Sequence, residues 1–460
     1  MNLFASIVLS AAILTTHPIT EQANMSVYIK NLTTGELIDC HREDKVVPPA
    51  SVMKLLTTGA ALELLGEDFR FPTVLEYTGT IRNDTLFGNL YVHGSCDPSL
   101  GDKGKNDFLY KWARVVKKAG IRYIEGGIVA DMTMLDGDAQ NPNWLCEDAG
   151  NYYAPGIFGL NYYGNTMNIV LKSGEVGSAA TIEKTEPKMD DVKFINHIRC
   201  AKIDYDGAFV RGIPFSFERY LTGSVPSKLG TFGIKGDLPN PGLLLVRHFK
   251  NILEESGVAV KREPTYISDY NPMTPPRMVL DTCFSAPLRD LIAETNINSN
   301  NLYAEAIFRY LGARSSLPGT IHNSQDVVRE FWRNRGVSVQ NALIKDGCGL
   351  APQDAVSAKA FVELLTYMYR SKYADAWMAS LPVSGQTGTL KSLCAKTELE
   401  GRIHAKSGTI AGTKNFAGYI DMPNGDVWVF AVFVNSAPGK SRSIQAVIQE
   451  YLLDVYNKHQ

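Results

Sequence analysis

The feature that most constrains the fold is a change of pattern along the chain, from one clear helix to a long β-rich stretch and back. Residues 48–66 read PPASVMKLLTTGAALELLG, in which two prolines keep the chain extended, apolar side chains recur at helical spacing, and Gly66 ends the run. Between about residues 72 and 237, short β-like runs alternate with turn-rich segments. A helical pattern returns at residues 242–257. We therefore expect a domain that is interrupted by a large β-rich insertion.

The rest of the chain predicts a mixed α/β (α+β) domain, formed by residues 25–71 together with residues 238–460. Residues 25–40 indicate two strands around a Thr-Thr-Gly turn. Helices are expected near residues 287–294, 301–312, 323–335 and 356–370, and from about 441 to 456. Strands are expected in GRIHAKSG, NFAGYIDM and DVWVFAVFVN, at residues 401–408, 415–422 and 426–435.

The N-terminal segment, residues 1–24, allows two interpretations. Residues 3–14 read LFASIVLSAAIL, which has about the length of a signal-peptide core and is too short to span a bilayer. No Lys or Arg precedes this run and no clean small-x-small cleavage site follows it, so a helix packed on the domain is the alternative. We favour the signal peptide, and therefore expect export to a bacterial periplasm or cell envelope.

Charge and motif content argue against several classes of protein. The net charge of −2, without a long basic run, argues against nucleic acid as a partner. The seven cysteines form no C-x-x-C pair and no Cys/His cluster at zinc spacing. The sequence also lacks H-E-x-x-H, G-x-x-x-x-G-K-[ST] and a strand-linked G-x-G-x-x-G. We expect neither a metal site nor a cofactor.

The start of the first helix carries a lysine where a capping pattern favours an acid. Glu or Gln three residues after Ser51 would complete a capping box, but Lys54 stands there. Residues three apart lie on one helix face, so the Lys54 amine can approach the Ser51 hydroxyl. The helix dipole and burial would favour the neutral amine, which could take the proton of the serine. Taken alone, the pattern also fits an ordinary helix cap.

Two further polar segments follow in the C-terminal half. Residues 296–312, NINSNNLYAEAIFRYLG, place Ser299, Asn300 and Asn301 at a helix start, where Ser and Asn are common as caps. Residues 404–412, HAKSGTIAG, place Lys406 at the end of a strand, which also fits a turn with a solvated lysine. Together, S-x-x-K, S-x-N and K-[ST]-G occur in the order that is typical of penicillin-binding proteins and class A β-lactamases.

The sequence between the motifs resembles one branch of that superfamily. The segments FRFPTVLEYTGTI, GNLYVHGSCDPSLG, NYYAPGIFGLN, KDGCGL, LPVSGQTGTL and AKSGTIAGTKNFAGYI are similar to the D-alanyl-D-alanine carboxypeptidase/endopeptidase family, the class C low-molecular-mass penicillin-binding proteins. The resemblance runs from about residue 25 to 455. It implies a penicillin-binding-type domain, an antiparallel sheet flanked by helices, with an insertion between the first two motifs, and the long gap between Ser51 and Ser299 fits such an insertion.

The resemblance also implies a mechanism and its residues. Ser51 would form an acyl-enzyme with Lys54 as base, and Ser299 would relay a proton to the leaving D-alanine amine. Substrate binding would fall to Asn301, Lys406, Ser407, Gly408 and Thr409. The expected substrates are peptidoglycan stem peptides, and the expected covalent inhibitors are β-lactam antibiotics. Cys348 and Ser407 depart from the residues that are commoner in the family.

One stretch of the insertion is a candidate for substrate choice. Residues 143–155 read NWLCEDAGNYYAP, and by resemblance Asp148 and Tyr153 would meet the amine-bearing side chain of the stem peptide. The alternative is a loop carboxylate and a packing tyrosine. Two other functions remain as alternatives for the whole chain: a serine β-lactamase or esterase on the same fold, and a cell-wall-binding relative without turnover. The oligomeric state and the balance between carboxypeptidase and endopeptidase stay open.

Overall fold

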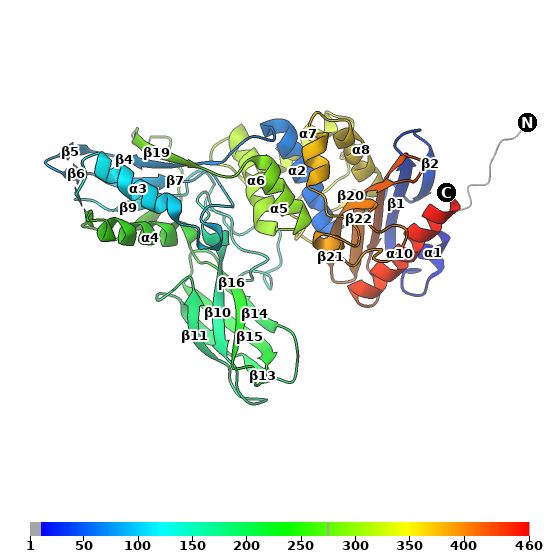
Figure 1. Cartoon of the computed structure of the whole chain (residues 1–460), viewed down its shortest axis with the longest axis horizontal. Coiled ribbons are helices and arrows are strands. Elements are labelled where there is room, and N and C mark those ends of the chain that lie inside the picture. Colours follow the sequence, from blue (N-terminus) through cyan, green and yellow to red (C-terminus); the bar gives the residue numbers. More distant parts are fainter. Residues whose placement is uncertain (1–10, 274–275, 460) are drawn as a thin grey trace, which may run out of the picture. The chain divides into compact units, whose positions relative to one another are not determined.

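The structure is a computed structural model that describes residues 11–273 and 276–459 (Figure 1). The chain divides into two compact units. The first unit comprises Met1–Phe69, Pro287–Ala304 and Ser324–Gln460. The inserted unit comprises Arg70–Ala286 and Glu305–Asn323. The segments of the inserted unit therefore fall between segments of the first unit along the chain.

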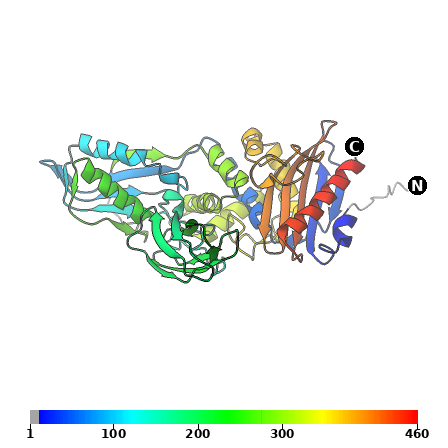
Figure 2. The same ribbon diagram turned by 60° about the horizontal axis from the view of Figure 1, so that its bottom comes forward.

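The first unit is built on a five-stranded antiparallel sheet in the order β2-β1-β23-β22-β21. Its strands are β1 (Asn24–Asn31), β2 (Leu37–His41), β21 (Ile403–Ile410), β22 (Thr413–Asp421) and β23 (Val427–Asn435). Strand β23 is apolar along almost its whole length because both faces of the sheet are covered. Phe433 packs against Phe361 of α8 (Ala358–Tyr369) on one face, whereas Phe430 and Val432 belong to the core beneath α10 (Ser441–Lys458), which crosses the other face in Figure 2.

The N-terminal run that suggested a signal peptide is described only in part. Residues 1–10 lie outside the described residues, and α1 (Ala12–Thr16) packs against α10. Leu14 is fully buried in the core beneath α10. This part of the segment therefore has the packing expected of an N-terminal helix. Among the described helices, none combines the length and the apolar content needed to span a bilayer.

Helix α2 (Lys54–Leu65) is buried on nearly all sides in the first unit. It follows a short 3₁₀ turn, η1 (Ala50–Met53), and ends at Gly66, which has a positive φ of 85°. Trp332 donates from Nε1 to the carbonyl of Leu56, and a Cβ at Gly59 would lie 2.8 Å from its ring. The remaining elements of this unit are β3 (Val46–Val47), β20 (Val356–Ser357), α5 (Leu288–Ile297), α9 (Ala374–Ala379) and η4 (Gly388–Leu390). In addition, α6 (Asn301–Ser315) begins in this unit and most of α7 (Ile321–Arg333) lies in it.

The inserted unit contains a mixed five-stranded sheet in the order β18-β9-β7-β4-β19. These strands are β4 (Pro72–Tyr77), β7 (Leu90–His93), β9 (Ile128–Asp131), β18 (Thr265–Ile267) and β19 (Met278–Phe284). Helices α3 (Asp107–Lys118) and α4 (Pro241–Glu255) pack on each other, and α4 also packs on β9. The helix α3 was not expected from a region whose pattern indicated short strands.

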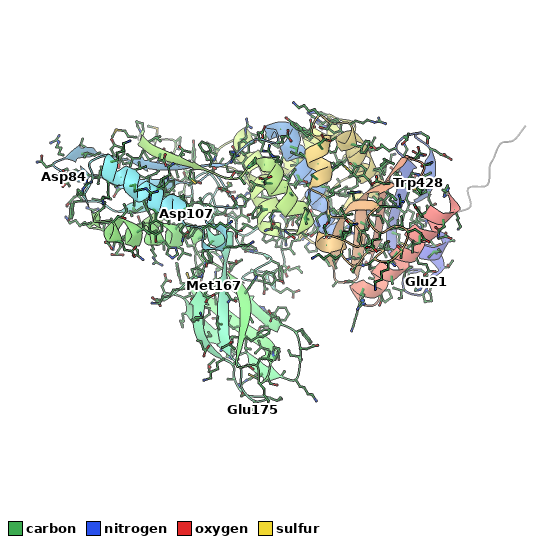
Figure 3. All side chains as sticks on the ribbon, viewed as in Figure 1. Glu21, Asp84, Asp107, Met167, Glu175 and Trp428 are labelled. Atoms are coloured by element: carbon green, nitrogen blue, oxygen red, sulfur yellow. The ribbon has the colours of Figure 1, made fainter. Side chains whose placement is uncertain are left out.

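Three smaller sheets complete the inserted unit. Their orders are β17-β8-β6-β5, β11-β10-β16, and β12-β15-β13 with β14 beside β15. Their strands are β5 (Thr80–Arg82), β6 (Thr85–Phe87), β8 (Tyr123–Ile124), β10 (Thr166–Lys172), β11 (Thr181–Glu186), β12 (Lys193–Asn196), β13 (Arg199–Ala201), β14 (Gly207–Arg211), β15 (Glu218–Pro226), β16 (Thr231–Asp237) and β17 (Ala259–Val260). Met167 of β10, labelled in Figure 3, belongs to the apolar core that these elements share with α3 and α4.

The expected second boundary of the insertion, after residue 237, differs from the structure. The inserted unit continues to Ala286 and takes in residues 305–323 as well. The reason is long-range packing: α4 covers β9, and β19 pairs with β4 in an antiparallel register that joins Met278 to Tyr77. Local periodicity shows that α4 is a helix but not which sheet it covers, so the sequence placed residues 238–286 in the wrong unit.

Candidate active site

Ser51 lies in the 3₁₀ turn that leads into α2, at a point where the backbone is constrained. Ala50, directly before it, has a left-handed φ of 48°, a conformation that is unfavourable for residues with a side chain. Asn415 of β22 holds the preceding loop, because its Nδ2 donates to the carbonyl of Pro48 at 2.8 Å. Helix α2 itself begins at Lys54, and its N-cap residue Met53 makes no side-chain cap. The serine is therefore presented from a fixed turn rather than used as the N-cap of the helix.

Lys54 is fully buried at the start of α2, and its amine meets three oxygen atoms. Nζ lies 3.0 Å from Ser51 Oγ, 2.6 Å from Asn301 Oδ1 and 2.8 Å from the carbonyl oxygen of Cys348. The amide and carbonyl oxygens can only accept hydrogen bonds, whereas the serine hydroxyl can also donate. A neutral amine that donates to both acceptors directs its lone pair to the serine hydroxyl. This arrangement can remove a proton from Ser51.

The loop that supplies the Cys348 carbonyl is held by Asp346. Its carboxylate accepts hydrogen bonds from the backbone N–H groups of Cys348, Gly349, Leu350 and Ala351, at 2.5 to 3.0 Å. Gly349 has a positive φ of 82°, and a Cβ there would lie 1.8 Å from the carbonyl oxygen of Ala50. Thr57 of α2 also donates to the carbonyl of Gly347. The carboxylate thus orients a carbonyl toward the Lys54 amine.

Ser299 and Lys406 form a second hydroxyl–amine pair. Lys406 is fully buried on β21 and donates from Nζ to Ser299 Oγ at 3.0 Å and to the carbonyl of Ser407 at 2.8 Å. Ser299 has a left-handed φ of 58°, and it precedes α6 by two positions. Such backbone conformations occur more often at functional sites because the surrounding packing must maintain them. Both serines are partly exposed, so both hydroxyls are accessible.

Strand β21 approaches the Ser51 turn closely at Gly408. A Cβ on Gly408 would lie 2.4 Å from the carbonyl oxygen of Pro49 and 3.2 Å from the backbone nitrogen of Ser51, so a larger residue does not fit. Ser407 donates from Oγ to Thr389 Oγ1 at 2.8 Å, and the next position, Thr409, is exposed. The S-x-x-K, S-x-N and K-[ST]-G residues of the sequence are therefore brought together within the first unit.

A third amine, which the sequence reading did not select, lies beside this cluster. Lys414 of β22 is 8% exposed and donates from Nζ to Thr409 Oγ1 at 3.0 Å. Burial lowers the pKa of Lys414. The pKa of Lys406 lies well below its usual value, first because of burial and then because Lys54 and Lys414 are close. The like charges of three neighbouring amines cannot all be held there at low cost.

The residues that the sequence reading missed gave local signals of different strength. Asp346 belongs to the segment KDGCGL, whose acid followed by two glycines is typical of a tight loop. Thr389, Asn415 and Lys414 show no pattern of their own, because their importance depends on which strand or loop lies beside them.

Asp148 and Tyr153 lie in the inserted unit and contact each other. The Tyr153 hydroxyl donates to Asp148 Oδ1 at 2.8 Å, and both side chains are partly exposed. Burial raises the pKa of Asp148, and the hydrogen bond from Tyr153 opposes this effect. Among the described residues, the second carboxylate oxygen accepts no hydrogen bond, and the group lies in a partly desolvated position.

Comparison with known proteins places this geometry in a family. Residues 9–454 match the D-Ala-D-Ala carboxypeptidase 3 (S13) family. A D-alanyl-D-alanine carboxypeptidase of Actinomadura sp. (strain R39) is 27% identical over 446 residues, which cover 92% of this chain and 79% of that protein. D-alanyl-D-alanine carboxypeptidase DacB of Haemophilus influenzae is 22% identical over 454 residues, which cover 96% and 92%.

The fold is also that of a solved structure. The crystal structure of penicillin-binding protein 4 (dacB) from Haemophilus influenzae superimposes with a TM-score of 0.83 at 23% identity, and the match covers 97% of this chain and 99% of that one. The penicillin-binding fold and the antiparallel sheet with flanking helices, both expected from the sequence, are therefore confirmed. With nearly its whole length matched, the chain belongs to the D-Ala-D-Ala carboxypeptidase 3 (S13) family of serine peptidases.

Proposed function

We propose that the protein removes the terminal D-alanine from peptidoglycan stem peptides through an acyl-enzyme on Ser51. The observation that carries the proposal is the contact of the Lys54 amine with Ser51 Oγ at 3.0 Å, together with its contacts to Asn301 and the Cys348 carbonyl. A serine hydroxyl is a weak nucleophile until a neighbouring base takes its proton. Lys54 is therefore the proposed base.

The proton must then reach the leaving group. When Ser51 Oγ attacks the D-Ala-D-Ala carbonyl, its proton passes to Lys54, and the leaving amine must gain a proton before the peptide bond breaks. Ser299, whose hydroxyl accepts from Lys406, is the proposed relay to that nitrogen. Water then attacks the acyl-enzyme, and the same groups work in reverse. Asn301 and Gly408 are proposed to hold the substrate backbone near Ser51.

Charge in the site suits a substrate that ends in a carboxylate. Lys414 brings one amine beside Thr409, and the Lys406 amine is close enough for the two to influence each other's pKa. A bound carboxylate would favour the protonated forms of both. Ser407 and Thr409 offer hydroxyls to the same group. The backbone N–H groups of Ser51 and Thr409 are the proposed oxyanion donors, where each donor contributes about 3 to 4 kcal/mol in comparable enzymes.

The test is intact-mass analysis after brief exposure to penicillin, followed by peptide mapping. A crystal structure of the Haemophilus influenzae relative contains a bound β-lactam, and a tethered ring leaving group would trap the acyl-enzyme here too. We expect one stable adduct per chain, on Ser51, and none in Ser51→Ala. Ser392→Ala, at an exposed serine of the first unit, is the control.

The same experiment separates the alternatives. An adduct that disappears rapidly with release of penicilloate indicates a β-lactamase, and folded protein without any adduct indicates a non-catalytic wall-binding relative. Incubation with cross-linked muropeptide dimers measures endopeptidase activity beside the carboxypeptidase reaction.

Export to a bacterial cell envelope is part of the proposal, because peptidoglycan lies outside the cytoplasmic membrane. Cell fractionation, with determination of the N-terminal residue of the mature chain, tests both export and the fate of residues 1–24.

The inserted unit is proposed to contribute to substrate choice through Asp148. Its free carboxylate oxygen suits the ammonium group of a diaminopimelate or lysine side chain in the stem peptide, and the Tyr153 hydroxyl fixes the other oxygen. A partly desolvated carboxylate of this kind forms a stronger contact with an ammonium group than a fully exposed one does.

A further inference from the structure

The inserted unit contains a cavity of about 420 Å³ within its own fold. Its lining includes the largely apolar side chains of Met134, Tyr270 and Tyr310 and the polar side chains of Glu76, His93 and Ser95. Cavities of this size, largely apolar and with a few convergent polar groups, are typical of small-ligand sites. None of these residues takes part in the proposed reaction at Ser51.

One polar group among the residues that line the cavity, the Ser95 hydroxyl, lacks a hydrogen-bond partner within the described structure. The residue is 6% exposed, and its Oγ has no hydrogen-bond partner among the described residues. A buried hydroxyl without a partner costs about 1 to 3 kcal/mol, so such groups are rare in folded proteins. A ligand in the cavity that donates a hydrogen bond would satisfy it.

The charges around the cavity favour a cationic ligand. Arg277 contacts both Glu76, at 3.2 Å, and Asp131, at 2.6 Å, and His93 Nδ1 lies 3.1 Å from the same Asp131 carboxylate. While His93 is neutral, two carboxylates share one guanidinium and one negative charge is in excess, and protonation of His93 cancels that excess. Burial lowers the pKa of His93, but the hydrogen bond and charge of Asp131 outweigh this effect and raise it, as expected beside an excess of negative charge.

The aromatic residues that line the cavity also suit a cationic ligand. Tyr270 and Tyr310 line the wall together with the flexible side chain of Met134. Tyrosine faces attract ammonium groups, and methionine packs well against alkyl chains of varied shape. An anionic ligand would meet the Glu76 carboxylate, and the neighbouring cation, Arg277, is already shared between Glu76 and Asp131.

We propose that this cavity binds a primary ammonium group on an aliphatic chain, with the ammonium at Glu76 and Ser95 and the alkyl chain against Met134 and the two tyrosines. This site lies within the inserted unit, involves none of the residues proposed for the reaction at Ser51, and goes beyond that reaction. Two sources share the chemistry: the amine side chain of a peptide, and a free aliphatic diamine.

The test uses the full chain after acylation by penicillin, so that Ser51 is blocked. Isothermal titration calorimetry with 1,5-diaminopentane and with Nα-acetyl-lysine amide is expected to show saturable binding of one molecule per chain. The Nε-acetylated form of the lysine probe is expected not to bind. Tighter binding of the lysine probe identifies a peptide as the source, and tighter binding of the diamine identifies a free amine.

Two variants locate the binding. Glu76→Gln is expected to weaken binding of both probes by about tenfold or more, since it removes a charge-assisted contact. Ser95→Ala is expected to weaken binding by a few-fold to about tenfold while the melting temperature stays the same or rises, because it removes an unsatisfied hydroxyl. If Ser95 had only a structural role, its substitution would not weaken binding while leaving the melting temperature unchanged or higher. Glu183→Gln, at an exposed acid of β11, is the control.

Three results would overturn the proposal: no binding of either amine at millimolar concentration, equal binding of the acetylated probe, or unchanged affinity in Glu76→Gln. Acylation of Ser51 is read separately, from the mass of the adduct. Failure of the proposed reaction and failure of this second site are therefore distinguishable, and the titration is equally informative on protein that penicillin does not modify.

Discussion

The two units of this protein bury charged groups in opposite ways. In the inserted unit, Arg219 and Asp237 are both about fully buried, and the guanidinium donates from Nε to the carboxylate at 2.7 Å. In the first unit, Lys406 and Lys414 are also buried, yet neither forms an ion pair with a carboxylate of the described chain. Their hydrogen bonds run to hydroxyl and carbonyl oxygens instead.

The difference separates a structural from a chemical use of buried charge. A buried ion pair keeps both partners charged, and removing one leaves the other uncompensated. Buried amines without a counterion shift toward their neutral forms, which gives them proton-transfer chemistry at neutral pH. The lowered pKa of Lys406, beside Lys54 and Lys414, follows this second pattern.

The largest effect is expected from removing the proposed base. Lys54→Met deletes the amine beside Ser51 while a side chain of similar length fills the buried position. Acylation by penicillin should slow by roughly a hundred- to ten-thousandfold, the usual loss when a general base is removed. The melting temperature should change little, because a buried amine is itself costly to desolvate.

The rate is measured by intact mass over time, and Lys391→Met, at an exposed lysine of the same unit, is the control. If Lys54→Met were acylated at the rate of the unmodified protein, another group would be the base. The buried amines of the first unit would then have no demonstrated chemical role.

Breaking the buried pair in the inserted unit should have the converse signature. Asp237→Asn leaves the Arg219 guanidinium buried without its counterion, and we expect a loss of about 3 to 5 kcal/mol in the free energy of unfolding. Urea unfolding measures the loss. The double variant Arg219→Met/Asp237→Leu should recover most of it, since neither charge then remains.

Asp190→Asn is the matched control, because its partner Lys188 is exposed and surface pairs contribute about 0 to 1 kcal/mol. A loss at Asp237 no larger than at Asp190 would mean that the buried pair is not structural.

Asp148 has a carboxylate that is neither fully buried nor paired with a cation in the described structure, so it lies between the two cases compared above. Asp148→Asn should lower kcat/KM by roughly ten- to a hundredfold for stem peptides with a free side-chain amine, since a charge-assisted contact is lost. Amine-blocked peptides and penicillin should react as before.

Tyr153→Phe, which keeps the carboxylate and removes only its hydrogen bond, should have a smaller effect on the same substrates. Equal losses on free and blocked peptides would instead assign Asp148 to holding its loop.

The smallest effect is expected at Asp97, a carboxyl buried without a cation. Burial raises its pKa to about 6, although Ser99 donates hydrogen bonds to it from both backbone and side chain. Because the folded pKa exceeds the unfolded value of about 4, its contribution to stability is complete below pH 4 and is lost as the pH rises through 6. Asp97→Asn should therefore stabilise the protein at pH 7, by at most the roughly 3 kcal/mol that a shift of about two pKa units represents, and have little effect at pH 4.

Unfolding at both pH values measures this difference, with the exposed Asp204→Asn as control. A gain of equal size at both pH values would show that Asp97 does not titrate in this range.

Much of the fold could be read from the sequence because its signals are local. The turn between β1 and β2, the helix α4 and the closing strands β21, β22 and β23 lie where periodicity indicated them. Helix α3 was not predicted because the surrounding β-like runs dominated the pattern. The full extent of the inserted unit was not predicted because β19 pairs with β4, which is distant from it in the sequence. Pairing of this kind leaves no mark on local periodicity.

The sequence by itself determined which chemical groups the protein has and their order: the serine with a lysine one turn later, the S-x-N segment and the K-S-G strand. Spacing within one turn of helix or one strand is set by backbone geometry, so it can be read directly. Only the tertiary structure decided that Asn301 and the Cys348 carbonyl meet the Lys54 amine, and that Lys406 meets Ser299. These contacts, and the burial that lowers the pKa of Lys406, depend on how strands and loops distant in sequence pack together, and desolvation exists only once that packing has excluded water.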